Sequence, residues 1–157
     1  MKPATNELFK TQNVETIVNT IETELKTRNE SPFWADKVVP FSRAILSILV
    51  PLREQNLLFT PEGTKTEELT PKLFLEWMDF MSLKGLAFTI QKSNAADTLL
   101  RTSIGEDECA KYEVIDLSYL GDYLAKYSVN LTDENLDFPI SNYNLHQGVK
   151  NVINTLL

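Results

Sequence analysis

Histidine and cysteine, two frequent carriers of acid–base and nucleophilic chemistry, are scarce in this sequence. His146 is the only histidine and Cys109 the only cysteine, so a zinc motif built on two histidines is impossible. Cys109 follows the acidic run 106–108 and precedes Glu113, and this negative charge disfavours the reactive thiolate. We therefore expect Cys109 to be an inert thiol. We expect His146 to be a surface or partly packed side chain near the start of the last helix, and not a catalytic base.

Motifs for nucleotides and metal ions are also missing. No G-x-x-x-x-G-K-[ST] string occurs, so we do not expect this chain alone to bind a nucleotide through such a loop. The spacing of a calcium loop is absent from the run 106–108 and from the later group Asp133, Glu134 and Asp137. We therefore expect no enzymatic activity, no cofactor and no metal for the chain on its own.

Negative charge is concentrated in the last third of the chain. The net charge is −7, and residues 106–157 hold nine acidic and three basic side chains. A protein that binds the phosphate backbone needs clustered Lys and Arg, so direct nucleic-acid binding is not expected. The bias is typical of a solvated surface or of a docking surface for a basic partner. For the second interpretation, the candidate partner-binding residues are Glu106, Asp107, Glu108, Glu113 and Asp116. Trp77 is a further candidate anchor, although a tryptophan in an apolar helix face is also typical of a core.

Length and hydropathy predict a single domain over residues 1–157. The chain is 43% hydrophobic, but no apolar run approaches the length of about 20 residues that a bilayer requires. No apolar segment follows Lys2, so the first residues do not resemble a signal peptide. A lone cysteine excludes an internal disulfide framework, which favours a reducing, cytoplasmic environment.

The most hydrophobic segment predicts a buried helix over residues 32–55. Ser31 can cap its first turn, and Pro32 occupies a position where a backbone N–H is not needed. Apolar residues cover nearly all faces of this segment, which indicates burial inside a domain. Pro40 and Pro51 each remove a backbone donor and should kink the helix. The expected inward face recurs at spacings of three and four, and consists of Trp34, Val38, Phe41, Ile45, Ile48 and Leu52.

Apolar periodicity predicts that the remaining elements are helices as well. Their expected ranges are 14–27 with Asn13 as N-cap, 70–81 with Leu73, Phe74, Trp77, Met78 and Met81 inward, 83–92, 94–101 followed by Gly105, 114–127, and a last helix capped by Ser141 or Asn142. Residues 60–69 and 128–140 are expected to be loops. The predicted fold class is therefore all-α, a single bundle of about six helices with a kinked, buried central helix.

Three segments of the central helix carry a family resemblance. Ser31-Pro32-Phe33-Trp34 opens the helix, Arg43-Ala44-Ile45-Leu46 continues it, and Leu52-Arg53-Glu54-Gln55 closes it. Together with the helices expected on either side, this order resembles the all-alpha domain of coupling proteins in type IV secretion and conjugation. Those proteins are hexameric, FtsK-like ATPases of the TraD/TraG class.

The resemblance implies a non-enzymatic docking domain of a larger ATPase on the cytoplasmic side of the bacterial inner membrane. Such a domain receives protein or nucleoprotein substrates for translocation. Its expected partners are the parent ATPase ring and a basic segment of a secreted protein substrate, a relaxase or an adaptor. The resemblance assigns no role to any single residue. Two alternatives stay open, a free-standing bacterial helical adaptor or chaperone without an attached ATPase, and a small helical enzyme.

Reversing the acidic run tests the predicted docking surface. The triple variant Glu106→Lys, Asp107→Lys and Glu108→Lys should keep the parent's melting temperature, because a solvated run contributes little to stability. Its association rate with a basic substrate tail or adaptor should fall several-fold at low ionic strength, because long-range attraction mostly speeds encounter. Stopped-flow measurement of the association rate checks this. An unchanged rate would exclude the run as the docking site.

Overall fold

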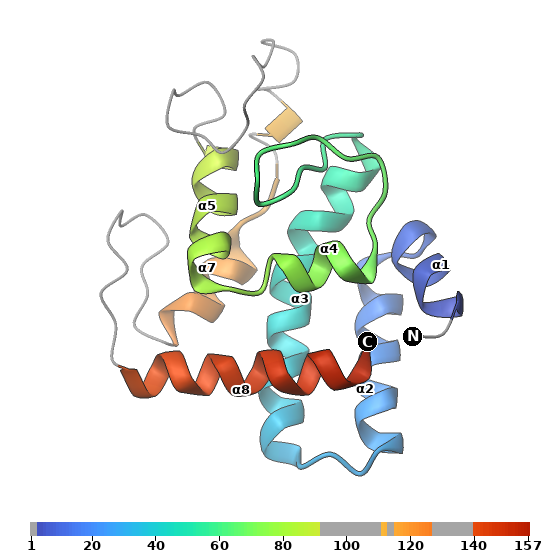
Figure 1. Cartoon of the computed structure of the whole chain (residues 1–157), viewed down its shortest axis with the longest axis vertical. Coiled ribbons are helices and arrows are strands. Elements are labelled where there is room, and N and C mark those ends of the chain that lie inside the picture. Colours follow the sequence, from blue (N-terminus) through green and yellow to red (C-terminus); the bar gives the residue numbers. More distant parts are fainter. Residues whose placement is uncertain (1–2, 92–110, 113–114, 127–139) are drawn as a thin grey trace.

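Four of the described helices, α2, α4, α7 and α8, pack against one central helix, α3. The computed structural model describes residues 3–91, 111–112, 115–126 and 140–157, and Figure 1 shows its helices. In these ranges the only regular pairing outside the helices is an antiparallel bridge between Phe59 and Lys65. The predicted all-α class is confirmed. The helices are α1 (Pro3–Thr11), α2 (Val14–Thr27), α3 (Pro32–Glu54), α4 (Pro71–Glu76), α5 (Phe80–Gln91), α7 (Ser118–Ala125) and α8 (Ile140–Leu156).

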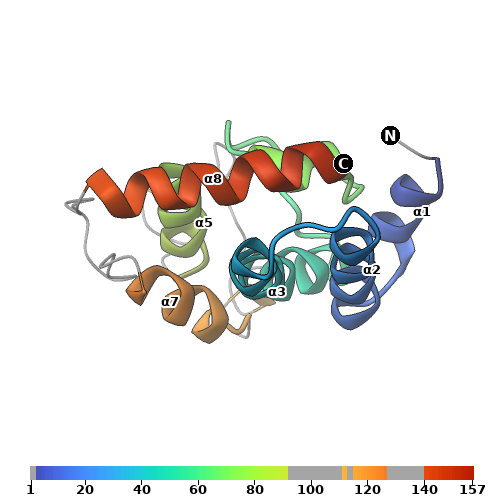
Figure 2. The same ribbon diagram turned by 90° about the horizontal axis from the view of Figure 1, so that it is seen from below.

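Helix α3 is the central element, as its composition predicts. It contacts α2, α4, α7 and α8, and Figure 2 shows α7 and α8 on opposite sides of it. Five of the six side chains on its expected inward face are fully buried, and only Trp34 keeps partial exposure. The helix continues through Pro40 and Pro51, and the kink at these prolines stays a prediction.

Helix starts follow the capping residues that the sequence indicates. The side chain of Asn13 accepts a hydrogen bond from the Thr16 N–H at 2.8 Å, and Ser31 accepts one from the Phe33 N–H at 3.2 Å. Thr70 caps α4 in the same way. Each cap satisfies a backbone donor that has no partner within the helix. The predicted starts at these three residues are confirmed.

Helices α2 and α3 end in the same way, on an asparagine in the left-handed region. Asn29 has φ 54° after α2, and Asn56 has φ 59° after α3. The N–H of the residue after each asparagine donates to a carbonyl in the last turn of the helix. Glu30 donates to the Leu25 carbonyl, and Leu57 donates to the Leu52 carbonyl. This hydrogen bond closes the helix end and fixes the direction of the exiting chain.

The predicted helix over 70–81 is wrong in its second half. Helix α4 ends at Glu76, and the N–H groups of Trp77 and Met78 bond to carbonyls three residues back instead of four. This tighter turn ends the helix, and α5 begins separately at Phe80. Met81 therefore leaves the expected inward face and is 72% exposed.

Two further helix boundaries differ from expectation. Helix α7 begins at Ser118 and not at residue 114, because the Asp116 side chain accepts the Ser118 N–H at 2.9 Å and holds the preceding chain in a turn. Helix α8 begins at Ile140, so Ser141 and Asn142 lie inside its first turn and do not cap it. The predicted helix 94–101, its end at Gly105 and nearly all of the predicted loop 128–140 lie outside the described residues.

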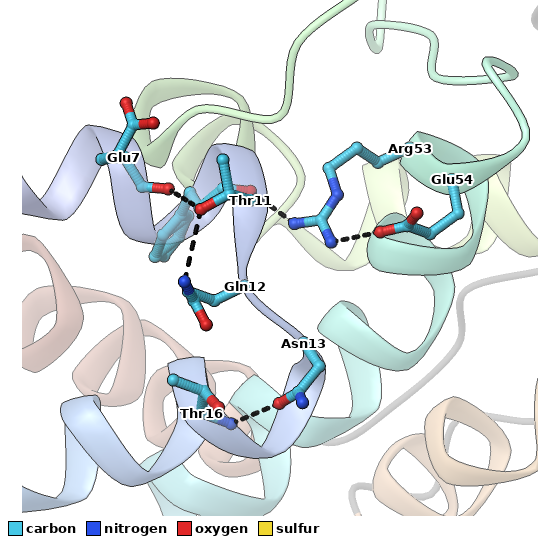
Figure 3. Close-up of polar contacts among 8 residues, drawn as sticks. Glu7, Thr11, Gln12, Asn13, Thr16, Arg53 and Glu54 are labelled. Carbon is cyan, nitrogen blue, oxygen red and sulfur yellow. Dashed lines mark hydrogen bonds and ion pairs between the residues drawn. The ribbon is translucent and has the colours of Figure 1, made fainter.

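Helix α1 was not predicted, yet it contributes to the core. Phe9 is fully buried and packs edge-to-face on Phe74, with ring centroids 5.4 Å apart. The guanidinium of Arg53 donates from Nη1 to the Phe9 carbonyl at 2.8 Å. Its Nη2 donates to Glu54, as Figure 3 shows. Arg53 is only 8% exposed, so the end of α3 is joined to the last turn of α1 by a nearly buried charged hydrogen bond.

A close contact joins the start of α3 to α8. A Cβ placed on Gly148 would lie 2.2 Å from Cη2 and 2.8 Å from Cζ3 of the Trp34 ring. No side-chain carbon tolerates such distances, so Trp34 occupies the space that any larger residue at 148 would need. Trp34 is therefore structural, as its place on the inward face of the predicted helix suggests.

A double-mutant cycle of Trp34→Ala and Gly148→Ala tests this contact. In an ordinary helix interior, Gly→Ala stabilises by about 1 kcal/mol. Here the added methyl group must displace the Trp34 ring, so Gly148→Ala should destabilise the parent by about 1–3 kcal/mol. In the Trp34→Ala background the same change should be neutral or stabilising, because the ring is gone. Urea unfolding of the four proteins measures the coupling, and strictly additive effects would contradict the contact.

Candidate functional site

One residue of the predicted acidic surface lies in the described ranges. Asp116 is exposed, and its pKa is lowered by the hydrogen bonds it makes with the hydroxyl and the backbone N–H of Ser118. The carboxylate therefore stays ionised while it also starts α7. Glu106, Asp107, Glu108 and Glu113 lie outside the described residues, so the docking surface that they would form with Asp116 stays a prediction.

Trp77 is a core residue in the structure. It is fully buried and packs edge-to-face on Phe59, at 5.4 Å between centroids. Phe59 in turn packs on Tyr112, whose hydroxyl donates to the Leu57 carbonyl at 2.9 Å. Trp77 thus holds the loop after α3 against α4 and offers no exposed ring to a partner. Its Nε1 has no hydrogen-bond partner within the described part of the chain.

His146 is fully buried, so the expectation of a surface or partly packed histidine is wrong. Its Nε2 lies against the Met78 carbonyl, and its Nδ1 lies 2.8 Å from the Tyr123 hydroxyl. A carbonyl can only accept, so Nε2 carries the proton and Nδ1 accepts from Tyr123. The ring also packs edge-to-face on Phe41. The histidine therefore joins α8 to α7 and to the turn before α5.

The environment of His146 keeps the imidazole neutral. Burial is the main cause that lowers its pKa to about 4, and the nearby charge of Lys150 acts in the same direction. The Met78 carbonyl and Asp79 oppose this shift but do not cancel it. A neutral, fully hydrogen-bonded imidazole without access to solvent is suited to structure and not to proton transfer with a bound substrate.

The described residues hold no candidate metal centre. No three His, Cys, Asp or Glu side chains in these ranges lie close enough together to bind a metal ion. In the same part of the chain, no helix is both long enough and apolar enough to cross a lipid bilayer.

The strongest candidate site on the described surface is a groove of about 440 Å³ between the end of α2 and the start of α3. Figure 2 views the molecule from the end where the loop joins these two helices. The residues that line the groove form an apolar floor and a charged rim. Its floor is apolar and consists of Leu25, Pro32, Ala35, Val39 and Pro40, and its rim carries Glu22, Lys26, Glu30 and Asp36. We call this feature the α2–α3 groove.

Local sequence positions the rim of the α2–α3 groove. Asn29 adopts a left-handed conformation after α2, and the Glu30 N–H donates to the Leu25 carbonyl. Together they fix the direction in which the chain leaves α2, and with it the position of Glu30. Pro40 has no N–H to donate to the carbonyl of Asp36, which would be its partner in an uninterrupted helix. The groove therefore lies beside a helix turn that lacks one backbone donor.

Two other hollows differ from it in composition. One of about 570 Å³ lies among α1, α2 and the end of α8, and its charged lining residues Glu24 and Arg28 pair with each other at 3.1 Å. The second, of about 550 Å³, lies beside α4 and has a mostly polar lining with both Lys65 and Lys72 present. Neither combines an apolar floor with a rim of one predominant charge.

No known family model, curated protein or solved structure matches this chain. The candidate site therefore rests on the geometry and chemistry of the described residues.

One pattern in the sequence indicates the α2–α3 groove, although the apolar periodicity of α3 alone does not reveal it. Ala35 and Val39 are four residues apart on a face of α3 that is not the expected inward face, and Asp36 adjoins them. Apolar residues on a second face next to a carboxylate are the pattern of a partly exposed groove. Because apolar residues cover nearly all faces of α3, this face was expected to be part of the core as well.

The pH dependence of stability tests the state of His146. Its pKa is about 4 in the folded chain and near 6.5 when unfolded, so the unfolded chain binds more protons between these values. The contribution is present above pH 6.5 and is lost as the pH falls toward 4, by up to about 3 kcal/mol. His146→Gln can keep both hydrogen bonds without titrating. In urea unfolding, the stability advantage of the parent over this variant should shrink by that amount between neutral pH and pH 4. A constant difference would contradict a buried neutral imidazole.

Proposed function

We propose that this chain is a protein-docking domain that binds a basic segment of a partner protein. One observation carries the proposal, namely that ion pairing on the described surface leaves a surplus of carboxylates. Charged residues without a local partner attract an oppositely charged molecule at long range and speed its association.

The described ranges hold fourteen acidic and twelve basic side chains, and the ion pairs engage half of these cations. Six of them pair with neighbouring carboxylates, which are Lys10 with Glu68, Lys26 with Glu22, Arg28 with Glu24, Arg43 with Glu15, Arg53 with Glu54 and Lys150 with Asp79. Several other carboxylates have no ion-pair partner among the described residues, including Glu7, Glu30, Asp36, Glu67, Glu76 and Asp122. This surplus accords with the net charge of −7 for the whole chain.

In its specific form, the proposal is that the chain docks substrates or adaptors for a type IV secretion coupling ATPase. Support comes from the three segments that resemble the family, which lie at the start, middle and end of α3. The closing pair Arg53 and Glu54 is in contact, and Arg53 also binds the end of α1. On this proposal the domain acts on the cytoplasmic side of the bacterial membrane, and its partner is a basic segment of a secreted protein, a relaxase or an adaptor.

The surrounding coding sequence separates this proposal from a free-standing helical adaptor. An open reading frame that continues into Walker-type motifs on both sides would support the coupling ATPase. A reading frame without them would favour the adaptor and leave the docking activity unaffected.

Binding of a basic peptide tests the docking activity itself. The probe is a fluorescein-labelled peptide of about 15 residues in which Lys flanks pairs of Leu, a length matched to a small interface. Fluorescence anisotropy should give saturable binding that weakens by about ten-fold or more when salt rises from about 50 to 500 mM, because screening removes the attraction. A matched peptide with Glu in place of Lys should not bind. Equal binding of both peptides, or of neither, would overturn the proposal.

A further inference from the structure

We propose that the α2–α3 groove is the place where the basic segment docks, with one or two aliphatic side chains of the segment on the floor and Lys or Arg at the rim. This inference rests on the proposed function and adds its location and the pattern of residues that it recognises. Four observations support the inference. They concern the floor of the groove, its rim, its backbone, and its comparison with the other hollows.

The floor is apolar and only partly covered. Ala35, Val39 and Pro40 are half-buried, while Leu25 beneath them is fully buried. A surface of this kind gains free energy when an aliphatic side chain displaces water from it. The volume of about 440 Å³ holds a few side chains and not a whole helix face, so the expected anchor is one or two aliphatic residues.

The rim has a surplus of negative charge. Three carboxylates and one ammonium group line the groove, which leaves a net charge of −2. Lys26 is already engaged by Glu22 at 3.3 Å. Glu30 and Asp36 have no ion-pair partner in the described ranges. Glu30 lies in the loop just before α3 and Asp36 in the second turn of that helix, so the groove offers a basic segment two separate carboxylates.

The α3 segment that lines the groove also lacks one backbone donor. Because Pro40 lacks an N–H, the Asp36 carbonyl loses the donor that an ordinary helix would provide. Carboxylates and carbonyls only accept hydrogen bonds, so the complementary partner must supply donors. Lys and Arg are the side chains that offer several donors together with the required charge.

The remaining hollows do not have this combination. At the hollow among α1, α2 and α8, the one arginine and the one glutamate neutralise each other. At the hollow beside α4, Lys65 and Lys72 stand among Glu67, Glu68 and Glu76, and the lining offers little apolar floor. A basic segment with an aliphatic anchor therefore fits the α2–α3 groove best.

The experiment compares charge changes in and away from the α2–α3 groove, with the labelled Lys/Leu peptide as probe. The groove variant is Glu30→Lys with Asp36→Lys, and the matched control is Glu67→Lys with Glu76→Lys beside α4. Both change the net charge equally. The groove variant should weaken binding by about ten-fold or more at low salt, and the control by less than about two-fold. Circular dichroism and thermal melting verify that both variants fold.

A floor variant provides an independent readout that does not alter charge. Ala35→Gln should remove the advantage of the aliphatic anchor. A peptide with Ser in place of Leu should bind the parent about ten-fold more weakly than the Lys/Leu peptide, but the two peptides should bind Ala35→Gln almost equally. This coupling between peptide and groove is not expected from a purely structural effect of the substitution.

The outcomes separate the two proposals. If the Lys/Leu peptide binds but the groove and control variants weaken it equally, the groove is not the site and the docking function stands. If Ala35→Gln leaves the preference for Leu intact, the aliphatic anchor lies elsewhere and the inference fails. If the parent binds no basic peptide, both the inference and the proposed function fail.

Discussion

The structure depends above all on the burial of α3. Ten of its residues are buried, and they lie on several faces of the helix from Val38 to Leu52. A helix that is apolar nearly all round must be surrounded, and here α2, α4, α7 and α8 all contact it. The first turns of α3 are different, because Ala35, Asp36 and Val39 keep exposure. Figure 1 shows the beginning of α3 extending past α8. The α2–α3 groove lies at this end of the helix, where the surrounding layer is incomplete.

Much of this fold could be predicted from the sequence, because the relevant signals are local. A cap such as Asn13 or Ser31 acts within three residues, and an apolar stripe is visible in a single helix. The predictions that were wrong depend on contacts that apolar periodicity does not indicate. Met81 became exposed because α4 ended in a tight turn. His146 became buried because Tyr123 and the Met78 carbonyl, both distant in sequence, satisfy its two ring nitrogens.

The candidate site, like the fold, could be predicted from the sequence only in part. Charge counting identified an excess of carboxylates, and this is a property of the sequence alone. It could not locate the groove, because Glu22 and Asp36 belong to different helices and meet only after α2 and α3 pack. The missing donor at Pro40 could be read from the sequence as a helix defect. Its position at the edge of an apolar groove could not, since that depends on the direction in which Asn29 turns the chain.

The contact between Trp34 and Gly148 also has a consequence for the evolution of this chain. The two residues are more than a hundred positions apart, yet a larger residue at 148 is compatible only with a smaller one at 34. In divergent descendants the two positions should therefore vary together even where the surrounding sequence has lost all similarity. An aromatic residue two positions after a Ser-Pro helix start, paired with a glycine in the middle of the last helix, is a signature by which remote relatives of this fold can be recognised.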